Sequence, residues 1–318
     1  MIDATNLEGH RQLSIIVPVY QNEKTLVELV KRLSELGREF TQIKTELILV
    51  DDGSVDSSLN TMLLIQPTDH LVTKIIKLSK NFGQIAAIEA GLRYSSGDAC
   101  VIISADLQDP PELIKEFVSE WEKGSDLVIA HRLNREDSKI SKFFSSLAYG
   151  IARRRYKQMP YGGFDFLLMS RRIVDHYLRM NGSNRFFQGD ILYLGFPLTL
   201  IPYTRLKRQE GQGSWSLGKR IKYFIDIALV SSYLPIRIVS LLGFVATMTS
   251  SLYAVVIFFA RLYGSFVVPG WAPLMIVVLL SGGLNLLILG LIGEYIWRIY
   301  DLQLSRPNFI VEKVLDLK

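Results

Sequence analysis

Short apolar runs alternate with amphipathic stretches over the first 130 residues. The runs begin near Leu13, Glu46, Lys74, Val101 and Leu127 and are rich in Val, Ile and Leu, which predicts strands buried on both faces. Residues 26–33 and 85–94 have helical spacing, and Pro-Pro-Glu-Leu at 110–113 suits the first turn of a helix. Strands alternating with helices predict right-handed crossovers and a mostly parallel sheet.

Two longer apolar stretches follow towards the end of the chain. Residues 238–260 carry no formal charge and, at ~1.5 Å per residue, are long enough to cross a ~30 Å bilayer core. A second uncharged stretch, 262–293, is interrupted at Pro269-Gly270. We predict a transmembrane hairpin with helices at about 238–260 and 273–296, and buried helices of a soluble domain are the alternative.

The distribution of cations predicts the orientation of this hairpin. Lys219, Arg220, Lys222 and Arg237 precede it and Arg298, Arg306, Lys313 and Lys318 follow it, whereas Arg261 lies between the helices. Both chain ends are therefore expected to be cytoplasmic. Glycines at 282, 283, 290 and 293 would allow close helix packing, within one chain or in a homo-oligomer.

These patterns predict four segments. Residues 1–215 form a cytoplasmic α/β domain, 216–235 an amphipathic interfacial helix, 236–298 the transmembrane hairpin and 299–318 a cytoplasmic tail. Residues 132–157 are basic and aromatic, which favours a helix facing anionic lipid head groups; a solvated charged face is the alternative.

Composition narrows the partners only partly. The 318-residue chain has a net charge of +5 and a pI near 9.1, which suits a nucleotide, a phospholipid surface or a nucleic acid. The single cysteine, Cys100, excludes an intrachain disulfide and is expected to be a core residue in a reduced compartment. Residues 1–12 do not resemble a secretory signal.

Polar side chains follow the predicted strands. Asp51 and Asp52 come after the second strand, and Asp106, Gln108 and Asp109 after the strand that begins at Val101. Carboxyl ends of parallel strands meet at one edge, where ligands bind, and carboxylate and amide oxygens suit Mg²⁺ or Mn²⁺. We interpret this edge as a metal and diphosphate site. The alternative is a solvated loop in which Asp109 caps the helix at Pro110.

Further candidates lie later in the chain. Asp165 stands in a glycine-rich turn beside aromatic residues, and either binds substrate or anchors its own turn. Arg205 and Arg208 precede a loop, 210–216, that contains two glycines and Ser214. Arginine presents a bidentate fork to phosphate, and glycine lets backbone amides approach an oxyanion.

Taken in order, these motifs resemble the polyisoprenyl-phosphate glycosyltransferases of glycosyltransferase family 2, which include bactoprenol glucosyltransferases and dolichyl-phosphate mannose synthases. The residues that carry the resemblance are Ile16–Tyr20, Val50–Asp56, Asn81–Gln84, Ser104–Glu112 and Gly293–Tyr300. The resemblance implies a GT-A (Rossmann-like) domain followed by interfacial helices and a two-helix transmembrane hairpin.

The resemblance also implies roles for individual residues. The donor nucleotide would be bound by Pro18, Tyr20, Asn22, Asp51, Asp52, Gln84 and Ser104, and the divalent cation, Mg²⁺ or Mn²⁺, by Asp106 and Gln108. The acceptor phosphate would meet Arg132, Arg135, Arg208 and Ser214, and catalysis would use Asp106, Asp165, Arg132, Arg205 and Arg208. The chain departs from the family at Ser104, where Asp is usual, at Asn22, where many members have Glu, and at Leu167, where many have Arg.

The implied reaction is transfer of a sugar, glucose as first choice, from a UDP-sugar to polyprenyl (undecaprenyl) phosphate with inversion, at the cytoplasmic face of the membrane. Mannosyl or aminoarabinosyl transfer by the same mechanism is an alternative. A processive polysaccharide synthase would need more membrane helices, and an inactive nucleotide-sugar-binding scaffold is suggested by Ser104. Nucleic-acid binding is not expected, because the cleft motifs are acidic.

Overall fold

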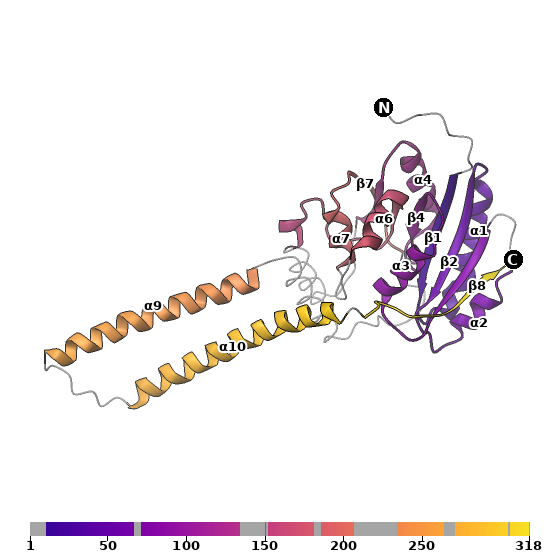
Figure 1. Cartoon of the computed structure of the whole chain (residues 1–318). Helices are drawn as coiled ribbons and strands as arrows, with labels where there is room; N and C mark the ends of the chain where they lie inside the picture. Colours follow the sequence, from indigo (N-terminus) through magenta and orange to yellow (C-terminus); the bar gives the residue numbers. More distant parts are fainter. Residues whose placement is uncertain are drawn as a thin grey trace. The chain divides into compact units, whose positions relative to one another are not determined.

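The computed structural model describes residues 11–66, 71–133, 150, 152–180, 186–206, 234–263, 271–304 and 306–317. The chain divides into two compact units. The first comprises residues 1–224 together with 307–318, and the second comprises residues 225–306. Residues 307–318 therefore return to the first unit after the second one (Figure 1).

The first unit is built on an eight-stranded sheet with the order β7-β5-β6-β4-β1-β2-β3-β8. The strands are β1 Arg11–Val19, β2 Ile43–Asp51, β3 Leu71–Leu78, β4 Ala99–Ile102, β5 Leu127–Arg132, β6 Leu167–Ser170, β7 Leu198–Tyr203 and β8 Val311–Leu317. Only β6 and β8 run antiparallel to their neighbours in this sheet. The prediction of a mostly parallel sheet is confirmed.

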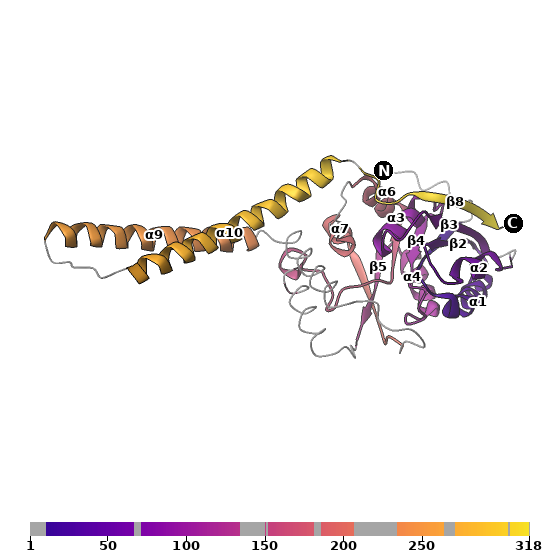
Figure 2. The same ribbon diagram turned by 90° about the horizontal axis from the view of Figure 1, so that it is seen from below.

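Helices cover both faces of the sheet (Figure 2). They are α1 Glu23–Glu39, α2 Ser58–Leu63, α3 Gln84–Arg93, η1 Pro111–Leu113, α4 Ile114–Glu122, α6 Arg171–Arg179 and α7 Phe187–Tyr193. On one face, Leu26 and Leu29 of α1 join Ile15 of β1 in a buried cluster. On the other, a Cβ at Gly91 of α3 would lie 2.4 Å from the Ile16 side chain, so helix and sheet approach closely there. Each fully buried Leu or Ile contributes about 1.5–3 kcal/mol to this packing.

The sheet has an added edge strand that the sequence analysis did not predict. Strand β8 pairs antiparallel with β3, with Val314 opposite Ile76. Leu315 and Leu317 pack against the core cluster of the sheet. Part of the predicted tail, 299–318, is therefore a structural element of the first unit.

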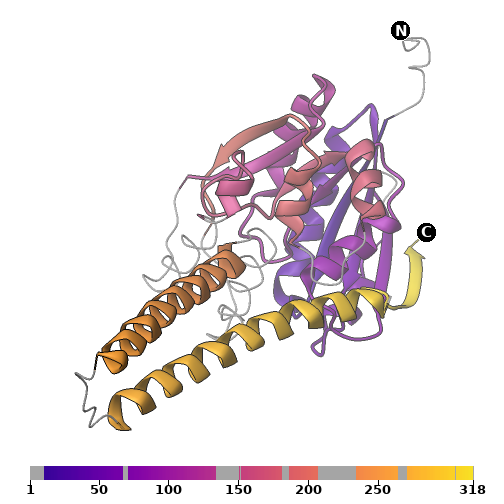
Figure 3. The same ribbon diagram turned by 60° about the vertical axis from the view of Figure 1, so that its left-hand side comes forward.

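The second unit contains two long helices, α9 Leu234–Leu262 and α10 Trp271–Gln303. They lie side by side, and a Cβ added at Gly243 of α9 would be 3.8 Å from Ile288 of α10 (Figure 3). By length and apolarity, one described segment could span a membrane, Leu280–Asp301; Leu241–Tyr253 is apolar but shorter. Helices α9 and α10 cover the two predicted ranges, 238–260 and 273–296, and a hairpin that crosses the membrane twice stays a prediction.

Several predicted features fall outside the described residues. These are the interfacial helix at 216–235, except its last two residues, and most of the basic segment 132–157. Arg135, Arg208 and Ser214 are also outside. Cys100 is fully buried in β4, as expected.

Candidate active site

The polar side chains predicted to meet at one edge of the sheet do lie at the carboxyl ends of parallel strands. Val19 at the end of β1 is in register with Asp51 at the end of β2, and Arg132 at the end of β5 with Tyr203 at the end of β7. Thr25 at the start of α1 donates a hydrogen bond of 2.6 Å to the carbonyl of Ala105, after β4. The loops after β1 and β4 are thus held together.

Asp51 and Asp52 are both buried. The Asp52 carboxylate accepts hydrogen bonds from the backbone amides of Phe82, at 2.7 Å, and Gly83, at 2.9 Å. Burial raises the pKa of Asp52 to about 6, and the two amide donors partly oppose this shift. Asp52 therefore fixes the loop that leads into α3, so its carboxylate is engaged by the protein itself.

Asp51 differs from Asp52 in having an oxygen to spare. Its Oδ1 accepts a hydrogen bond of 3.0 Å from the amide of Ser54. Its Oδ2 is buried and has no hydrogen-bond partner within the described part of the chain. A buried acceptor without a partner is costly and uncommon. Asp51 is therefore the more suitable of the pair to accept a hydrogen bond from a ligand.

The loop after β1 is tied to the start of α2, the helix that follows β2. The side-chain oxygen of Asn22 accepts a hydrogen bond of 3.1 Å from the backbone amide of Tyr20. The backbone amide of Asn22 donates one of 2.9 Å to the hydroxyl of Ser58. Tyr20 is 41% exposed, which leaves its ring available for stacking. Pro18 lies in β1, and Gln84 is exposed at the start of α3. The predicted donor residues thus lie near the carboxyl ends of β1 and β2, in the loops that follow them and at the start of α3, and Ser104 lies in the loop after β4.

The predicted metal residues lie after β4. Asp106 is 8% exposed, and its carboxylate accepts a hydrogen bond of 3.2 Å from the backbone amide of Gln108. Leu107 between them has a positive φ of 56°, which is uncommon outside glycine and turns the chain sharply. The Gln108 side-chain nitrogen donates to the carbonyl of Leu206, at 3.4 Å, so its oxygen is the atom left for a ligand.

This donor set suits a cation that is held jointly with a substrate. The described residues contain no group of three or more His, Cys, Asp or Glu side chains able to hold a metal ion. One carboxylate, Asp106, and the amide oxygen of Gln108 are too few for a closed protein site. Mg²⁺ and Mn²⁺ commonly bind through one or two carboxylates and complete their shell with phosphate oxygens and water. The residues therefore fit a divalent cation that arrives with a diphosphate.

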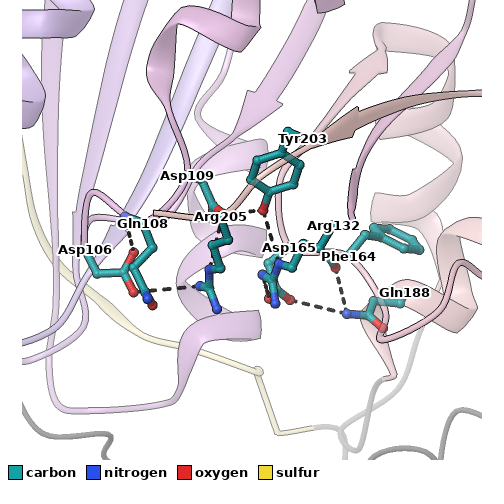
Figure 4. A network of polar contacts seen from close by, with 9 residues as sticks. All are labelled: Asp106, Gln108, Asp109, Arg132, Phe164, Asp165, Gln188, Tyr203 and Arg205. Atoms are coloured by element: carbon teal, nitrogen blue, oxygen red, sulfur yellow. Dashed lines mark hydrogen bonds and ion pairs between the residues drawn. The ribbon is translucent and has the colours of Figure 1, made fainter. Parts of the chain in front are cut away.

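A chain of charged and polar groups runs beside this site (Figure 4). Arg132 donates to Asp165, at 2.8 Å, and its Nε donates to the hydroxyl of Tyr203, at 3.1 Å. Tyr203 in turn donates to Asp109. Arg205 lies 3.9 Å from Asp106 and 3.5 Å from Asp109. Asp106, Arg132, Asp165 and Arg205, predicted separately, therefore belong to one network.

Electrostatics differ between the acids of this network. Burial raises the pKa of Asp109, although Arg132 and Arg205 oppose the shift. Burial also acts to raise the pKa of Asp165, but Arg132 and Arg205 outweigh it and hold that pKa below its ordinary value. Asp165 is thus kept ionised. Its two oxygens are held by Arg132 and Gln188, which come from other elements, so its bonds extend beyond its own turn.

Three members of the network were not assigned such roles from sequence. Asp109 belongs to the predicted metal and diphosphate edge, and the alternative that it caps a helix is wrong: η1 has no side-chain cap, and the carboxylate accepts a hydrogen bond from Tyr203. Tyr203 ends a strand in which a proline breaks the apolar pattern. Gln188 donates to the carbonyl of Phe164, at 2.7 Å, and to Asp165, at 3.3 Å. Nothing in the local sequence around Tyr203 or Gln188 signals these partners.

Comparison with known proteins gives relatives over almost the whole chain. The uncharacterized glycosyltransferase YkcC of Bacillus subtilis is 38% identical over 96% of this chain and 95% of its own length. The undecaprenyl-phosphate 4-deoxy-4-formamido-L-arabinose transferase of Pseudomonas fluorescens is 33% identical, with 95% and 90% covered. The SfII prophage-derived bactoprenol glucosyl transferase of Shigella flexneri is 29% identical, with 95% and 98% covered.

A solved structure shares the fold of the first unit. Mannosyl-3-phosphoglycerate synthase of Rubrobacter xylanophilus superposes with a TM-score of 0.50 at 13% identity, over 68% of this chain and 71% of that one. The doubly wound sheet with two antiparallel strands is thus the GT-A fold that the motifs implied. The profile of Glycosyl transferase family 2 matches residues 14–178, which carry most of β1, strands β2 to β6 and the acidic loops after β2 and β4. The chain belongs to glycosyl transferase family 2 and is a glycosyltransferase.

Proposed function

We propose that this glycosyltransferase transfers a sugar from a UDP-sugar to polyprenyl phosphate, with inversion, and that undecaprenyl phosphate is the carrier. Two relatives of nearly full length support the acceptor, since their names specify bactoprenol and undecaprenyl phosphate. Glucose is our first choice of sugar, by the name of the Shigella flexneri relative. Aminoarabinose, which is related to the 4-deoxy-4-formamido-L-arabinose in the name of the Pseudomonas fluorescens relative, and mannose are the alternatives.

The observation that carries this proposal is that Asp106, in the loop after β4, lies beside Arg205. Asp106 is nearly buried, and the Arg205 guanidinium lies 3.9 Å from its carboxylate. A carboxylate beside a guanidinium offers a cation ligand and a phosphate fork in one place. In the proposed complex Asp106 and Gln108 would hold Mg²⁺ or Mn²⁺ together with the diphosphate. When bound, this cation would neutralise the charge that develops on the departing diphosphate.

The other groups place the reactants. The spare buried oxygen of Asp51 suits an N–H donor of the nucleobase, and Tyr20 suits stacking beside it. The acceptor is a phosphate monoester and already an anion, so it attacks the anomeric carbon without a strong general base. Asp165, kept ionised and 42% exposed at its side chain, would bind sugar hydroxyls, while Arg205 would contact a phosphate group.

The membrane arrangement is part of the proposal. The segment Leu280–Asp301 is long and apolar enough to cross a bilayer, and α9 lies beside it. Together with the cations that flank these helices in the sequence, this supports an integral membrane protein whose catalytic domain and both termini are cytoplasmic. Alkaline carbonate extraction of membranes is the test: the protein is expected in the pellet, and its release would contradict an integral anchor.

A donor panel tests the reaction itself. Purified protein with Mn²⁺ or Mg²⁺, undecaprenyl phosphate and each of several UDP-sugars should release UDP with one sugar and form the lipid-linked product. Asp106→Ala should abolish turnover with folding intact. Asp175→Asn, an exposed acid on α6, is the matched control and should remain active. Absence of UDP release with every donor would contradict the proposal. Nucleotide binding without turnover would favour the inactive scaffold.

A further inference from the structure

Asp109 is the most deeply buried charged group of the site. Its side chain is 0% exposed, and it follows Asp106 by three positions in the loop after β4. The Oδ1 atom accepts the hydrogen bond of Tyr203 and lies 3.5 Å from Nε of Arg205. A buried carboxylate destabilises a fold unless it is paired. The partners of Asp109 both belong to β7 and the segment after it, so Asp109 joins that region to the metal-binding loop.

A second set of contacts leads from Asp109 to Asp165. The Tyr203 hydroxyl donates a hydrogen bond to Asp109 and accepts one of 3.1 Å from Arg132. Arg132 in turn fixes Asp165, because its Nη2 donates a hydrogen bond of 2.8 Å to that carboxylate. Gln188 holds the other oxygen of Asp165. A single line of hydrogen bonds therefore connects Asp109, Tyr203, Arg132 and Asp165, and Gln188 of α7 binds the last of them (Figure 4).

The residues of this line, and Arg205 beside it, differ in their exposure to solvent. Asp109 is fully buried, and the Arg132 side chain is only 9% exposed. The Asp165 side chain is 42% exposed and that of Arg205 is 28% exposed. A substrate can therefore reach Asp165 and Arg205, whereas Asp109 is enclosed by protein and Arg132 nearly so. The buried groups can act on a substrate only through the two exposed ones.

We infer that Asp109 and Tyr203 are positioning residues for sugar transfer: Tyr203 holds Asp165 through Arg132, and Asp109 binds Tyr203 and lies beside Arg205. The inference rests on the proposed function in that Asp165 and Arg205 are taken to contact the reactants. One buried carboxylate would then set the distance between the sugar-binding acid and the phosphate-binding arginine. A pair of reactants that must meet in one geometry is sensitive to such a distance.

Tyr203→Phe is the sharpest single test. The variant removes the hydroxyl and keeps the ring, which stands edge-on to Phe166 with centroids 6.4 Å apart. We expect kcat per folded molecule to fall about tenfold or more, as for loss of a charge-assisted hydrogen bond. KM for the UDP-sugar should stay within about twofold of the wild-type value, because Tyr203 makes no contact with Asp51, the residue proposed to bind the nucleobase. Tyr177→Phe is the control, because Tyr177 of α6 is also a buried tyrosine. This variant should leave kcat unchanged.

A merely structural role predicts a different pattern. Tyr203→Phe would then lower the thermal midpoint and leave kcat per folded molecule unchanged, which would overturn the inference. Combining Tyr203→Phe with Arg132→Lys sharpens the test, because the hydroxyl is argued to act through Arg132. The double variant should be no slower than the slower single variant, whereas multiplied losses would contradict a shared line of action.

A binding measurement separates this inference from the proposed reaction. Wild-type protein with Mn²⁺ is titrated with inorganic pyrophosphate and the thermal midpoint is recorded, alongside Asp109→Asn and Arg205→Ala. We expect both variants to bind pyrophosphate about tenfold more weakly than the wild type. Wild-type affinity in Asp109→Asn would overturn the positioning of Arg205, whichever acceptor the enzyme uses. Failure of undecaprenyl phosphate as acceptor, with weaker pyrophosphate binding in Asp109→Asn, would contradict only the proposed function.

Discussion

The side-chain amide of Asn308 donates a hydrogen bond of 2.9 Å to the carboxylate of Glu89, which precedes it by 219 positions in the chain. Glu89 is 2% exposed on α3 and also pairs with Arg93. Nearby, the amide of Ser79 donates to the carbonyl of Ile310, at 3.0 Å. The segment that follows α10 is therefore attached to α3, the helix that follows the loop bound by Asp52.

Asn308→Ala should lower the unfolding free energy of the first unit by about 1–3 kcal/mol, since it leaves a buried carboxylate short of one donor. Glu312→Ala is the comparison, because it breaks an ion pair with Lys77 whose side chains are 31% and 50% exposed. That exposed pair is worth at most about 1 kcal/mol. Thermal midpoints of both variants provide the measurement, and a larger loss in Glu312→Ala would show that the Asn308 contact is unimportant.

Deletion of residues 307–318 should have a larger effect. It removes β8, together with the packing of Leu315 and Leu317 on the core, at a cost of roughly 3 kcal/mol. It also leaves β3 as an open edge that can pair with other chains. We expect a lower thermal midpoint and more aggregation on size-exclusion chromatography. Lys313→Ala, at an exposed position of β8, should behave as wild type; a stable, monodisperse deletion variant would contradict a structural role for β8.

The contrast between β4 and β8 shows what the sequence could predict. The apolar run at Val101 identifies a central strand because burial on both faces selects such residues. Strand β8 reads Val-Glu-Lys-Val-Leu-Asp-Leu, with three charges and no regular alternation, and its pairing with β3 supplies what the pattern lacks. In the candidate site, motifs single out Asp106, Arg132 and Asp165, which the structure brings into one network. Tyr203 and Gln188 could not be found from motifs, because their partners lie 94 and 23 positions away.

The pKa of Asp52 predicts a pH dependence of stability. Its pKa rises from 3.8 to about 6 on folding, so in this range the folded protein holds a proton that the unfolded chain releases. The contribution of this group to stability is therefore present below about pH 4 and lost as the pH rises through 6, on the order of 2 kcal/mol in all. The difference in thermal midpoint between wild type and Asp52→Asn, measured from pH 4 to 7, should shift against the wild type as the pH rises. A constant difference would exclude the raised pKa.

Gly53 is required by its backbone and by its surroundings. It has a φ of +67°, and a Cβ there would lie 2.6 Å from the backbone nitrogen of Asn81. Gly53→Ala should cost about 2 kcal/mol or more and displace the loop that Asp52 binds, which should weaken UDP binding. Gly124→Ala is the matched control, with a φ of +101° and nothing within 4 Å of the added Cβ. It should cost only about 1 kcal/mol and leave UDP binding unchanged; equal effects of the two variants would contradict the steric argument.

Ser104 stands two positions before Asp106, where the resemblance to the family implies a second acid, and the proposed cation site therefore has a single carboxylate. Ser104→Asp should raise the affinity for Mn²⁺ in the presence of UDP by about tenfold, because an added carboxylate is a stronger ligand for a hard cation than a hydroxyl. Isothermal titration with Mn²⁺ measures this, with Ser104→Asn as a control that adds similar bulk without charge. The affinity of Ser104→Asn should change much less. If Ser104→Asp bound Mn²⁺ no more tightly than wild type, position 104 would not face the cation, and Asp106 would have to bind it with the diphosphate and Gln108 alone.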